Sequence, residues 1–544
     1  MTVTPDAGDR TLASRPPGLA RSTVTMTLLT AVSRATGLVR VVVVAAVIGD
    51  TFLGNTYQST NTIPNIIFEL MVAGTFQAVL IPALVRYADR GEDAEAERVA
   101  GSVFGVSLVA LFSVAAVGMV LSPLIARLLF SGSDPSVRAD QVRLGTIFLL
   151  IFLPQVGMYA AGMVATGVLN ARGRFAVPVI APVVNNVIVC VAYGLFWVSR
   201  DGAAPDLSLT PLQIAILAGG TTAGVVGFCA LPLLAVHRSS FRLRPRVDWR
   251  DPAVRRILRM GVWAAGFLAS TQLLILVELL LANRVRGGVV ALQIGWTFFL
   301  LPYALFAQPV LTALFPAMSR QVALRDDRSF ARSVESGAEM ISLFVIPTAI
   351  ALVAVGPAMC RTILFGEISS SGVADVARVI VAFAPGVIGY GLLLFFARAL
   401  YARDDARTPT VVNLAAAVGA SVAMAATFGL VDDRWRVPAL AAWHALAYSV
   451  AAVVMAGIVR RRLAPDHRPA LLRRLRPQLL AVVPVAVVGT LVGRAVPLGS
   501  RAGALVGGAA VGLAIFVAFV AITALLGGPR PAQMASALRG GGAT

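Results

Sequence analysis

The sequence predicts an all-α polytopic membrane protein with about fourteen transmembrane helices, arranged as two six-helix lobes in a parallel pseudo-twofold repeat plus two C-terminal helices. The first observation is composition, because 58% of residues are hydrophobic and only 13% are charged, with a mean hydropathy of +0.82. An ordinary soluble domain has about 25% charged residues. The other two observations are the length of the apolar segments and an internal repeat.

Apolar stretches of about 20 residues are long enough to cross roughly 30 Å of hydrocarbon. A polar, proline-containing N-terminus has no pattern of a cleavable signal peptide, so the first span is expected to remain in the mature protein. In order along the chain, the expected spans are 26–48, 58–85, 99–121, 144–168, 176–197, 212–236, 258–281, 289–315, 338–359, 378–400, 410–429, 437–459, 479–496 and 502–526.

The two halves of the chain resemble each other. The segment AVLIPALVR ending at Arg86 returns as TALFPAMSR ending at Arg320, 234 residues later. Six crossings separate the spans that carry these segments, and because that number is even, both halves enter the bilayer in the same direction. A second set agrees at a near-identical offset: Phe152, Pro154 and Tyr159 match Phe383, Pro385 and Tyr390.

Arginine distribution predicts the orientation. All 46 basic residues are arginine, and more than twice as many flank one set of helix ends as the other, which places both termini in the cytoplasm. The net charge of +19 is explained by topology and anionic lipid headgroups, so no nucleic-acid partner is expected. The predicted organisation is an N-terminal tail (1–25), an N-lobe (26–236), an arginine-rich linker (237–257), a C-lobe (258–459), a basic loop (460–478), two further helices (479–526) and a C-terminal tail (527–544).

Motifs for enzymatic chemistry are absent from the sequence. It contains no phosphate-binding Walker loop, no nucleophile elbow and no zinc-protease motif, so a transporter is predicted rather than an enzyme. Three cysteines in apolar segments are expected in the core, and three dispersed histidines predict no metal site or bound cofactor. A coupling ion or the membrane potential as energy source stays open.

Ionisable residues inside spans are the candidates for substrate binding, because burying them in lipid is costly. Arg34 and Arg40 are six residues apart, within about 60° on a helix, so both can face one cavity and bind an anion. Alternatively they extend to the interface or pair with an acid such as Glu69. Glu69 and Glu278 are the matching acids, each able to balance an arginine, bind a cation or carry a proton.

Polar and helix-bending residues complete the candidate site. Asn55 and Asn65 are predicted either to contact the substrate or to join helices. His444 is expected to be a hydrogen-bonded packing residue rather than a proton relay. The prolines predicted to bend the second and eighth spans, where the backbone loses a donor, are Pro64, Pro82, Pro302 and Pro316.

Several of these segments carry a family resemblance. SRATGLVR at 33–40, IPN at 63–65, G-x-F at 74–76, IP at 81–82 and the LNA segment at 169–171 resemble the MurJ (MviN) family, lipid II flippases of the multidrug/oligosaccharidyl-lipid/polysaccharide exporter superfamily. The resemblance covers nearly the whole chain. It departs from the family pattern where paired arginines are replaced by Phe68 and Glu69.

The resemblance implies a bacterial inner-membrane protein that moves an undecaprenyl-pyrophosphate-linked peptidoglycan precursor to the outer leaflet by alternating access, for cell-wall synthesis. Its expected partners are the lipid-linked glycan and membrane lipids. Two alternatives remain open: a flippase or antiporter for another lipid-linked glycan or amphiphile, which the missing charges favour, and a transport-inactive scaffold that binds cell-wall synthesis enzymes.

Overall fold

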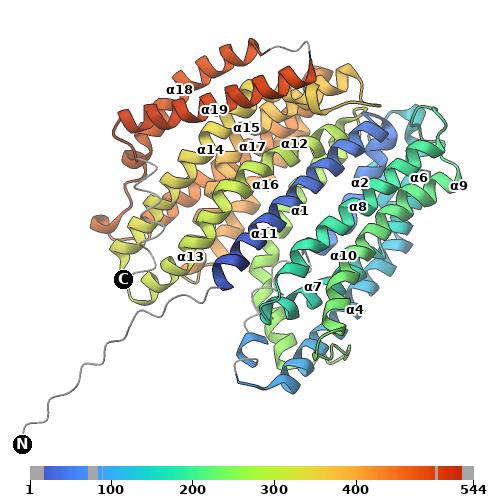
Figure 1. Ribbon diagram of the computed structural model, residues 1–544, viewed down its shortest axis with the longest axis horizontal. Helices are drawn as coiled ribbons and strands as arrows, with labels where there is room; N and C mark the ends of the chain where they lie inside the picture. The colour runs from blue at the N-terminus through green and yellow to red at the C-terminus, as the bar shows by residue number, and fades with distance from the viewer. Residues whose placement is uncertain (1–17, 71–83, 88–89, 497–499, 530–544) are drawn as a thin grey trace, which may run out of the picture.

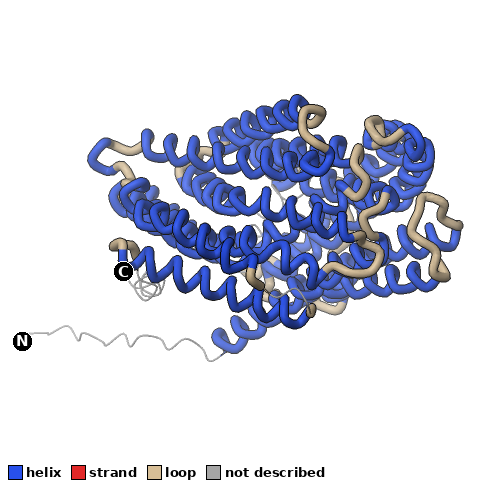
Figure 2. The backbone as a smooth tube through the Cα atoms, turned by 90° about the horizontal axis from the view of Figure 1, so that it is seen from above, coloured by secondary structure: helices blue, strands red, loops and turns tan. Residues whose placement is uncertain are grey.

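A computed structural model describes residues 18–70, 84–87, 90–496 and 500–529. All regular secondary structure in these ranges is helical (Figures 1 and 2). Thirteen helices, or runs of helices that follow one another directly, are long and apolar enough to cross a membrane. The predicted all-α polytopic fold is therefore confirmed. The remaining expected span, 58–85, includes residues 71–83 and Pro82, which lie outside the described residues.

Most helices extend well beyond the apolar segments that predicted them. Short π or 3₁₀ turns interrupt the described helices at Ala215–Gly219, Tyr303–Ala307 and Pro465–His467, and residues 69–70 after α2 are also π-helical. The α-helices are α1 (Gly18–Ile48), α2 (Phe52–Phe68), α4 (Asp93–Val120), α5 (Ser122–Leu129), α6 (Pro135–Phe152), α7 (Gln155–Ala171), α8 (Ala176–Ser199), α9 (Pro211–Ile214), α10 (Gly220–His237), α11 (Pro252–Ala282), α12 (Gly288–Pro302), α13 (Gln308–Ala323), α14 (Asp327–Ile363), α15 (Ser370–Ala402), α16 (Arg407–Thr427), α17 (Asp433–Arg461), α18 (Leu471–Arg494) and α19 (Arg501–Leu525).

Polar caps mark where several long helices begin. Asp326 accepts a hydrogen bond from the backbone N–H of Ser329 at 3.0 Å and caps α14, and Ser369 accepts from Gly372 at the start of α15. Such caps satisfy backbone donors that have no partner within the helix. Hydrogen bonds from the hydroxyl and the backbone N–H of Ser329 also hold the pKa of Asp326 below its usual value.

The helices pack in two groups. Helices α1–α10 contact mainly one another, with α8 against α1 and α10 and α7 against α4 and α10, and we call them the first group. Helices α11–α17 form the second group around the α15–α17 and α14–α15 contacts, and α18 and α19 lie on the outside of α14 (Figure 1). The two groups correspond to the two halves of the sequence repeat.

Polar contacts join the two groups at one end of the bundle, which we call the seal. Asn55, in the first turn of α2, donates from Nδ2 to the carbonyl oxygen of Val285 at 2.8 Å and accepts from the backbone N–H of Val289 at 3.1 Å. Asn55 and Val289 are 234 residues apart, which is the offset of the sequence repeat. The starts of two equivalent helices, α2 and α12, therefore meet each other here.

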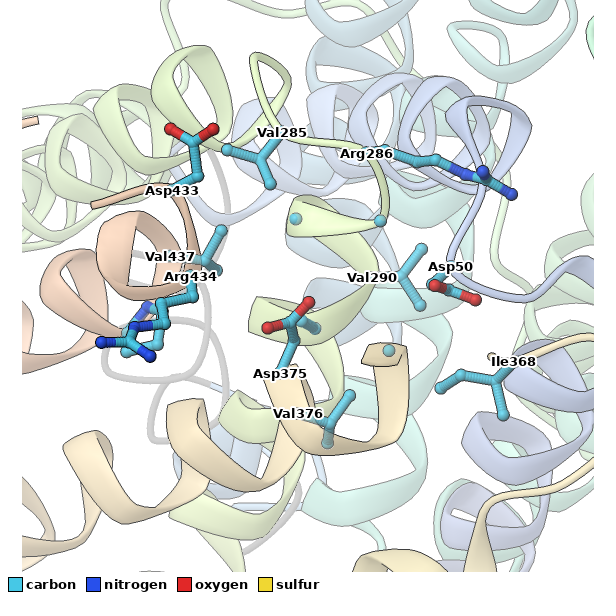
Figure 3. Close-up of a pocket in the computed structure, with 15 residues that line it drawn as sticks. Asp50, Val285, Arg286, Val290, Ile368, Asp375, Val376, Asp433, Arg434 and Val437 are labelled. Atoms are coloured by element: carbon cyan, nitrogen blue, oxygen red, sulfur yellow. The ribbon is translucent and has the colours of Figure 1, made fainter. Parts of the chain in front are cut away.

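Further contacts widen the seal on both sides of Asn55. Arg200, at the end of α8, is buried and forms an ion pair with Glu367 at 2.8 Å. Asp50, in the turn between α1 and α2, accepts hydrogen bonds from the backbone N–H and the hydroxyl of Ser369 at 2.7 and 2.5 Å. Figure 3 shows Asp50 in the small cavity beside the first turn of α15, opposite Val290 of α12.

The segment between α10 and α11 lies along the first group rather than extending away from it. The backbone N–H of Arg246 donates to the carbonyl oxygen of Gly101 at 2.9 Å, and Arg98 pairs with Asp251 at 2.7 Å. A Cβ atom at Gly105 would lie 2.2 Å from the carbonyl oxygen of Arg246, so only glycine allows this approach. The linker is thus fixed to α4 up to the residue before α11.

The predicted helix-bending prolines occupy different settings. Pro64 is buried inside α2, and Pro316 lies inside α13. Pro302 is the last residue of α12 and is followed directly by the π-helical turn Tyr303–Ala307. Irregular turns of this kind accompany bends in helices. The helix geometry therefore changes directly after Pro302, whereas the π-helical residues 69–70 follow Pro64 by about one turn.

We expect Gly366→Ala to lower the thermal unfolding midpoint in detergent more than Gly202→Ala does. Both glycines have positive φ, 82° and 81°, so alanine at either position adds strain of about 1–3 kcal/mol. A Cβ at Gly366 would also lie 2.3 Å from the carbonyl oxygen of Ala46 across the seal, whereas at Gly202 it would meet open space. Equal shifts for the two variants would contradict the close packing of the seal.

Candidate functional site

A polar cavity of about 160 Å³ lies within the first group and is closed on one side by α12 of the second. Side chains from α1, α2, α7, α8, α10 and α12 line it. Its polar lining consists of one guanidinium, four side-chain amides of the first group and one of the second, three phenols and two threonine hydroxyls: Arg40, Gln58, Asn61, Asn65, Asn185, Gln293, Tyr57, Tyr159, Tyr193, Thr62 and Thr221. No carboxylate lines this cavity within the described part of the chain.

Hydrogen-bonded hydroxyl groups close the cavity on the side of the seal. The hydroxyl of Tyr193 donates to that of Tyr57 at 2.6 Å, and Tyr57 is 2.6 Å from the hydroxyl of Thr221. Tyr57 and Tyr193 are almost fully buried, and the ring of Tyr57 packs edge-on against Phe148 and Phe152. A connected set of buried hydroxyls is rigid when each member has a partner. The cavity wall nearest the seal is therefore rigid and uncharged.

The two predicted arginines are separated by the structure. Arg40 is partly buried and lines the cavity, whereas Arg34, six residues earlier on α1, is exposed and does not. Neither forms an ion pair with any acid in the described ranges, so the expected alternative of a pair with Glu69 is not observed. The cavity thus presents one uncompensated cation, whose planar donors suit phosphate or carboxylate.

Asn65 and Asn55 have different surroundings although both lie on α2. Asn65 lines the cavity, where its side-chain oxygen accepts a hydrogen bond from the hydroxyl of Tyr159 at 3.2 Å. Asn55 is fully buried in the seal with both ends of its amide bonded to backbone groups. Glu69 follows Asn65 by one helical turn, is partly exposed and does not line the cavity.

Glu278 lies away from the cavity and is paired with the residue expected to be a packing histidine. Its Oε1 is 2.5 Å from Nδ1 of His444, and both side chains are buried in the second group. The helix that carries Gln293 in the cavity wall, α12, lies between this pair and the cavity, since Trp296 of α12 packs on the His444 ring. His444 therefore has a polar partner in addition to its packing contacts.

Sequence reasoning did not single out Tyr57, Asn185, Tyr193 and Gln293 as cavity residues. A phenol or amide within an apolar helix is a weak signal, because it is as often a contact between helices. Gln293 could not have been found through the repeat, because its equivalent 234 residues earlier, Ser59, does not line the cavity. Nor could the tyrosines, because their hydroxyls meet only after three helices have packed.

The chain is similar to known proteins over most of its length. The family model described as lipid II flippase MurJ matches residues 44–499, which is most of the chain. The chain belongs to the lipid II flippase MurJ family. Within that family, it is 26% identical over 414 residues to the probable lipid II flippase MurJ of Vibrio cholerae, covering 74% of this chain and 76% of that protein. The lipid II flippase MurJ of Burkholderia cenocepacia is 25% identical over 407 residues, covering 73% and 76%.

The fold of this chain is also similar to that of solved structures. A lipid II flippase MurJ in an inward closed conformation superposes with a TM-score of 0.71 at 16% identity, covering 92% of this chain and 98% of that one. An inward-facing multidrug resistance transporter of the MATE family gives 0.64 at 12% identity, covering 81% and 97%. These identities are low, so the structures establish a shared fold.

We expect Asn55→Ala to lower the free energy of unfolding by about 2 kcal/mol or more. The change leaves the buried N–H of Val289 without a partner, at about 1–3 kcal/mol, and removes one of the two hydrogen bonds that the carbonyl of Val285 accepts, the other coming from the N–H of Gly288. Asn65→Ala is the matched control on the same helix, and because Asn65 is exposed its change should stay within about 0.5 kcal/mol. Denaturation followed by fluorescence measures both. A larger loss in Asn65→Ala would refute this division of roles.

Proposed function

We propose that this protein translocates an undecaprenyl-pyrophosphate-linked peptidoglycan precursor, lipid II, from the inner to the outer leaflet of the bacterial cytoplasmic membrane. Family membership over residues 44–499 makes it a membrane transporter rather than an enzyme, and it supports this substrate class. The observation that carries the proposal is an unpaired guanidinium, Arg40, in a cavity free of acids among its described lining. That residue would bind the pyrophosphate.

The amide-rich lining suits the rest of such a substrate. Side-chain amides both donate and accept hydrogen bonds, which matches the hydroxyl and peptide groups of a glycopeptide. Asn61 and Asn65 of α2 and Gln293 of α12 lie in the same cavity as Arg40, so sugar or peptide groups beside the pyrophosphate can reach them. The lipid tail would remain in the bilayer.

Translocation requires the two helix groups to separate at alternate ends. The cavity of about 160 Å³ is smaller than the roughly 300–1,000 Å³ of sites for drug-sized ligands, so it must widen to admit a glycolipid headgroup. The polar contacts that join the groups in the described residues are at the seal, so widening is easiest at the opposite end. With the predicted orientation, which places both termini in the cytoplasm, that end faces the cytoplasm.

The free energy needed to open the seal is small enough for substrate binding to supply. Each neutral hydrogen bond contributes about 0.5–1.5 kcal/mol net, and a bond to a charged group about 1.5–3 kcal/mol. The seal contains few such contacts, centred on Asn55, Asp50 and the Arg200–Glu367 pair. Differential binding of substrate to the two states can supply energies of this size.

A second candidate is a flippase for another lipid-linked glycan. The observation favouring it is that the cavity contains one cation in its described lining, whereas a pyrophosphate is served best by several. A lipid-linked glycan with fewer negative charges would need fewer cationic side chains in the cavity. In either case the partners are the glycolipid and membrane lipids, and cell-wall synthesis enzymes are expected neighbours.

We expect Arg40→Ala to reduce lipid II translocation by about 10- to 100-fold, while Arg34→Ala changes it by less than about twofold. Arg40 lies in the cavity, so its removal costs the charged hydrogen bonds to the substrate, worth about 1.5–3 kcal/mol. Arg34 is exposed outside the cavity and makes no such bonds to the substrate. Arg40→Lys keeps the charge without the planar fork and should give an intermediate rate. The measurement is lipid II reaching the outer leaflet of vesicles that contain the purified protein.

The same variants can be tested in cells. A bacterial host depleted of its own lipid II flippase should grow when it expresses the wild-type chain or Arg34→Ala, and not with Arg40→Ala present in the membrane at equal amounts. Wild-type rescue that persists in Arg40→Ala would contradict the proposed role of this residue. Vesicles that translocate a different lipid-linked glycan and not lipid II would favour the second candidate.

A further inference from the structure

A buried acid–base pair lies in the second group, outside the cavity. Glu278 of α11 and His444 of α17 are 7% and 0% exposed, and Oε1 and Nδ1 are 2.5 Å apart. Their side chains come from helices that are 166 residues apart in sequence. A charged pair of this kind is expensive to bury in a membrane-spanning region and usually has a function.

Aromatic rings surround the pair. The His444 ring centroid lies 4.6 Å from Tyr448, 5.0 Å from Trp296 and 5.6 Å from Phe383. These rings come from α17, α12 and α15, so three helices shield the imidazole from water. The site is therefore one of low polarity, in which a net charge is costly.

Among the side chains that the structure describes, no other charged group contacts the pair, and Glu69, an acid of the first group, interacts electrostatically with Tyr390. The titratable neighbours are the phenols of Tyr390 on α15 and Tyr448 on α17, and α12 has no charged residue. The arginines of the packed elements are engaged elsewhere or exposed: Arg378 with Asp375, Arg436 with Asp433, Arg98 with Glu95 and Asp251, Arg284 over Phe428, Arg398 over Phe315, Arg407 over Trp263, and Arg127 exposed on α5.

Net charge then decides the number of protons that the pair holds. With one proton shared between carboxylate and imidazole, the pair is neutral. Without that proton it carries a charge of −1, and with a second proton a charge of +1, and both are disfavoured by the aromatic surroundings. The proton exchanged is taken from water and returned to water, and no other reactant is needed.

One atom of the pair has no partner. Nε2 of His444 is buried without a hydrogen bond to any described residue. A histidine with a purely structural role usually satisfies both ring nitrogens, because leaving one unpaired costs free energy. An unpaired Nε2 is available to receive or release a proton when water reaches it.

The pair is placed where its charge can affect the arrangement of the two groups. Leu276 and Leu280, on either side of Glu278 in sequence, pack against the core that α2, α5 and α6 form in the first group. On the other side of the pair, Trp296 belongs to α12, which also carries Gln293 in the cavity wall. A change of charge at the pair therefore acts on two helices that contact the first group.

We propose that the Glu278–His444 pair is a proton-binding site, and that loading it with one proton stabilises the sealed arrangement of the two helix groups. The transport part of this inference rests on the proposed flippase function, and proton binding itself does not. Loss of the proton leaves a buried negative charge, which favours an arrangement that admits water to α11 and α17. By linkage, movement of the groups changes the affinity for the proton.

Trp296 supplies a direct measurement of proton binding. A protonated imidazole quenches the fluorescence of an indole in contact with it, and the two rings are 5.0 Å apart. We expect the purified wild-type protein in nanodiscs to show a pH-dependent fluorescence transition, and Trp296→Phe to lack it. In Glu278→Gln the midpoint of the transition should move, because the carboxyl partner of the imidazole is gone.

The matched control is Glu339→Gln, which removes another buried carboxyl of the second group that has no histidine partner. Its transition should coincide with that of the wild type. His444→Gln should abolish the transition, and it serves as the second variant if Glu278→Gln does not fold. A wild-type protein without a transition carried by Trp296, or an unchanged midpoint in Glu278→Gln, would overturn the proposal.

Coupling to transport is tested separately in lipid II vesicles with an imposed pH difference. The wild type and Glu339→Gln should change rate by about threefold or more per tenfold proton gradient, and His444→Gln, which removes the titrating ring, should not respond. A pH response kept in His444→Gln overturns the coupling. Vesicles without any lipid II transport would count against the flippase function, while the fluorescence result would still decide whether the pair binds a proton.

Discussion

The architecture depends on one amide that bridges the two halves of the repeat. Asn55 bonds the backbone on both sides of the α11–α12 turn, at Val285 and at its repeat equivalent Val289. The N–H of Val289, in the first turn of α12, has no partner within its own helix, and a buried unpaired N–H costs about 1–3 kcal/mol. Asn55 therefore joins α2 and α12 at their first turns, and both helices then continue along the cavity. The same contact therefore determines both which end of the bundle is closed and where the cavity lies.

Charge is distributed very unevenly around this frame. Arginines are numerous at helix ends, yet Arg40 is the one arginine in the described cavity lining, and the buried core of the second group contains the Glu278–His444 pair instead. A single cation in a hydroxyl- and amide-rich wall attracts an anion without holding it irreversibly. Weak binding of this kind suits a carrier, since the substrate must also leave.

The sequence was sufficient for the fold, because length, hydropathy and an internal repeat are properties of single segments. It was less sufficient for the site. Arg40 and Asn65 were found because polar groups in apolar helices are conspicuous, but Arg34 and Asn55 have the same sequence signal and lie elsewhere. Which of the two arginines reaches the cavity depends on how α1 is rotated about its axis. Which of the two asparagines reaches it depends on the contact between the first turns of α2 and α12. His444 was expected to be hydrogen-bonded, but the sequence could not name its partner, because Glu278 is 166 residues away.

The attachment of the linker to α4 has a mechanical consequence. Because Arg246 and Asp251 hold the chain against the first group up to the start of α11, the free tether between the groups is very short. A short tether restricts sliding and leaves rotation about the beginning of α11 as the main degree of freedom. The linker therefore limits how far the two helix groups can rotate relative to each other. Inserting residues after Asp251 would relax this limit without changing either group.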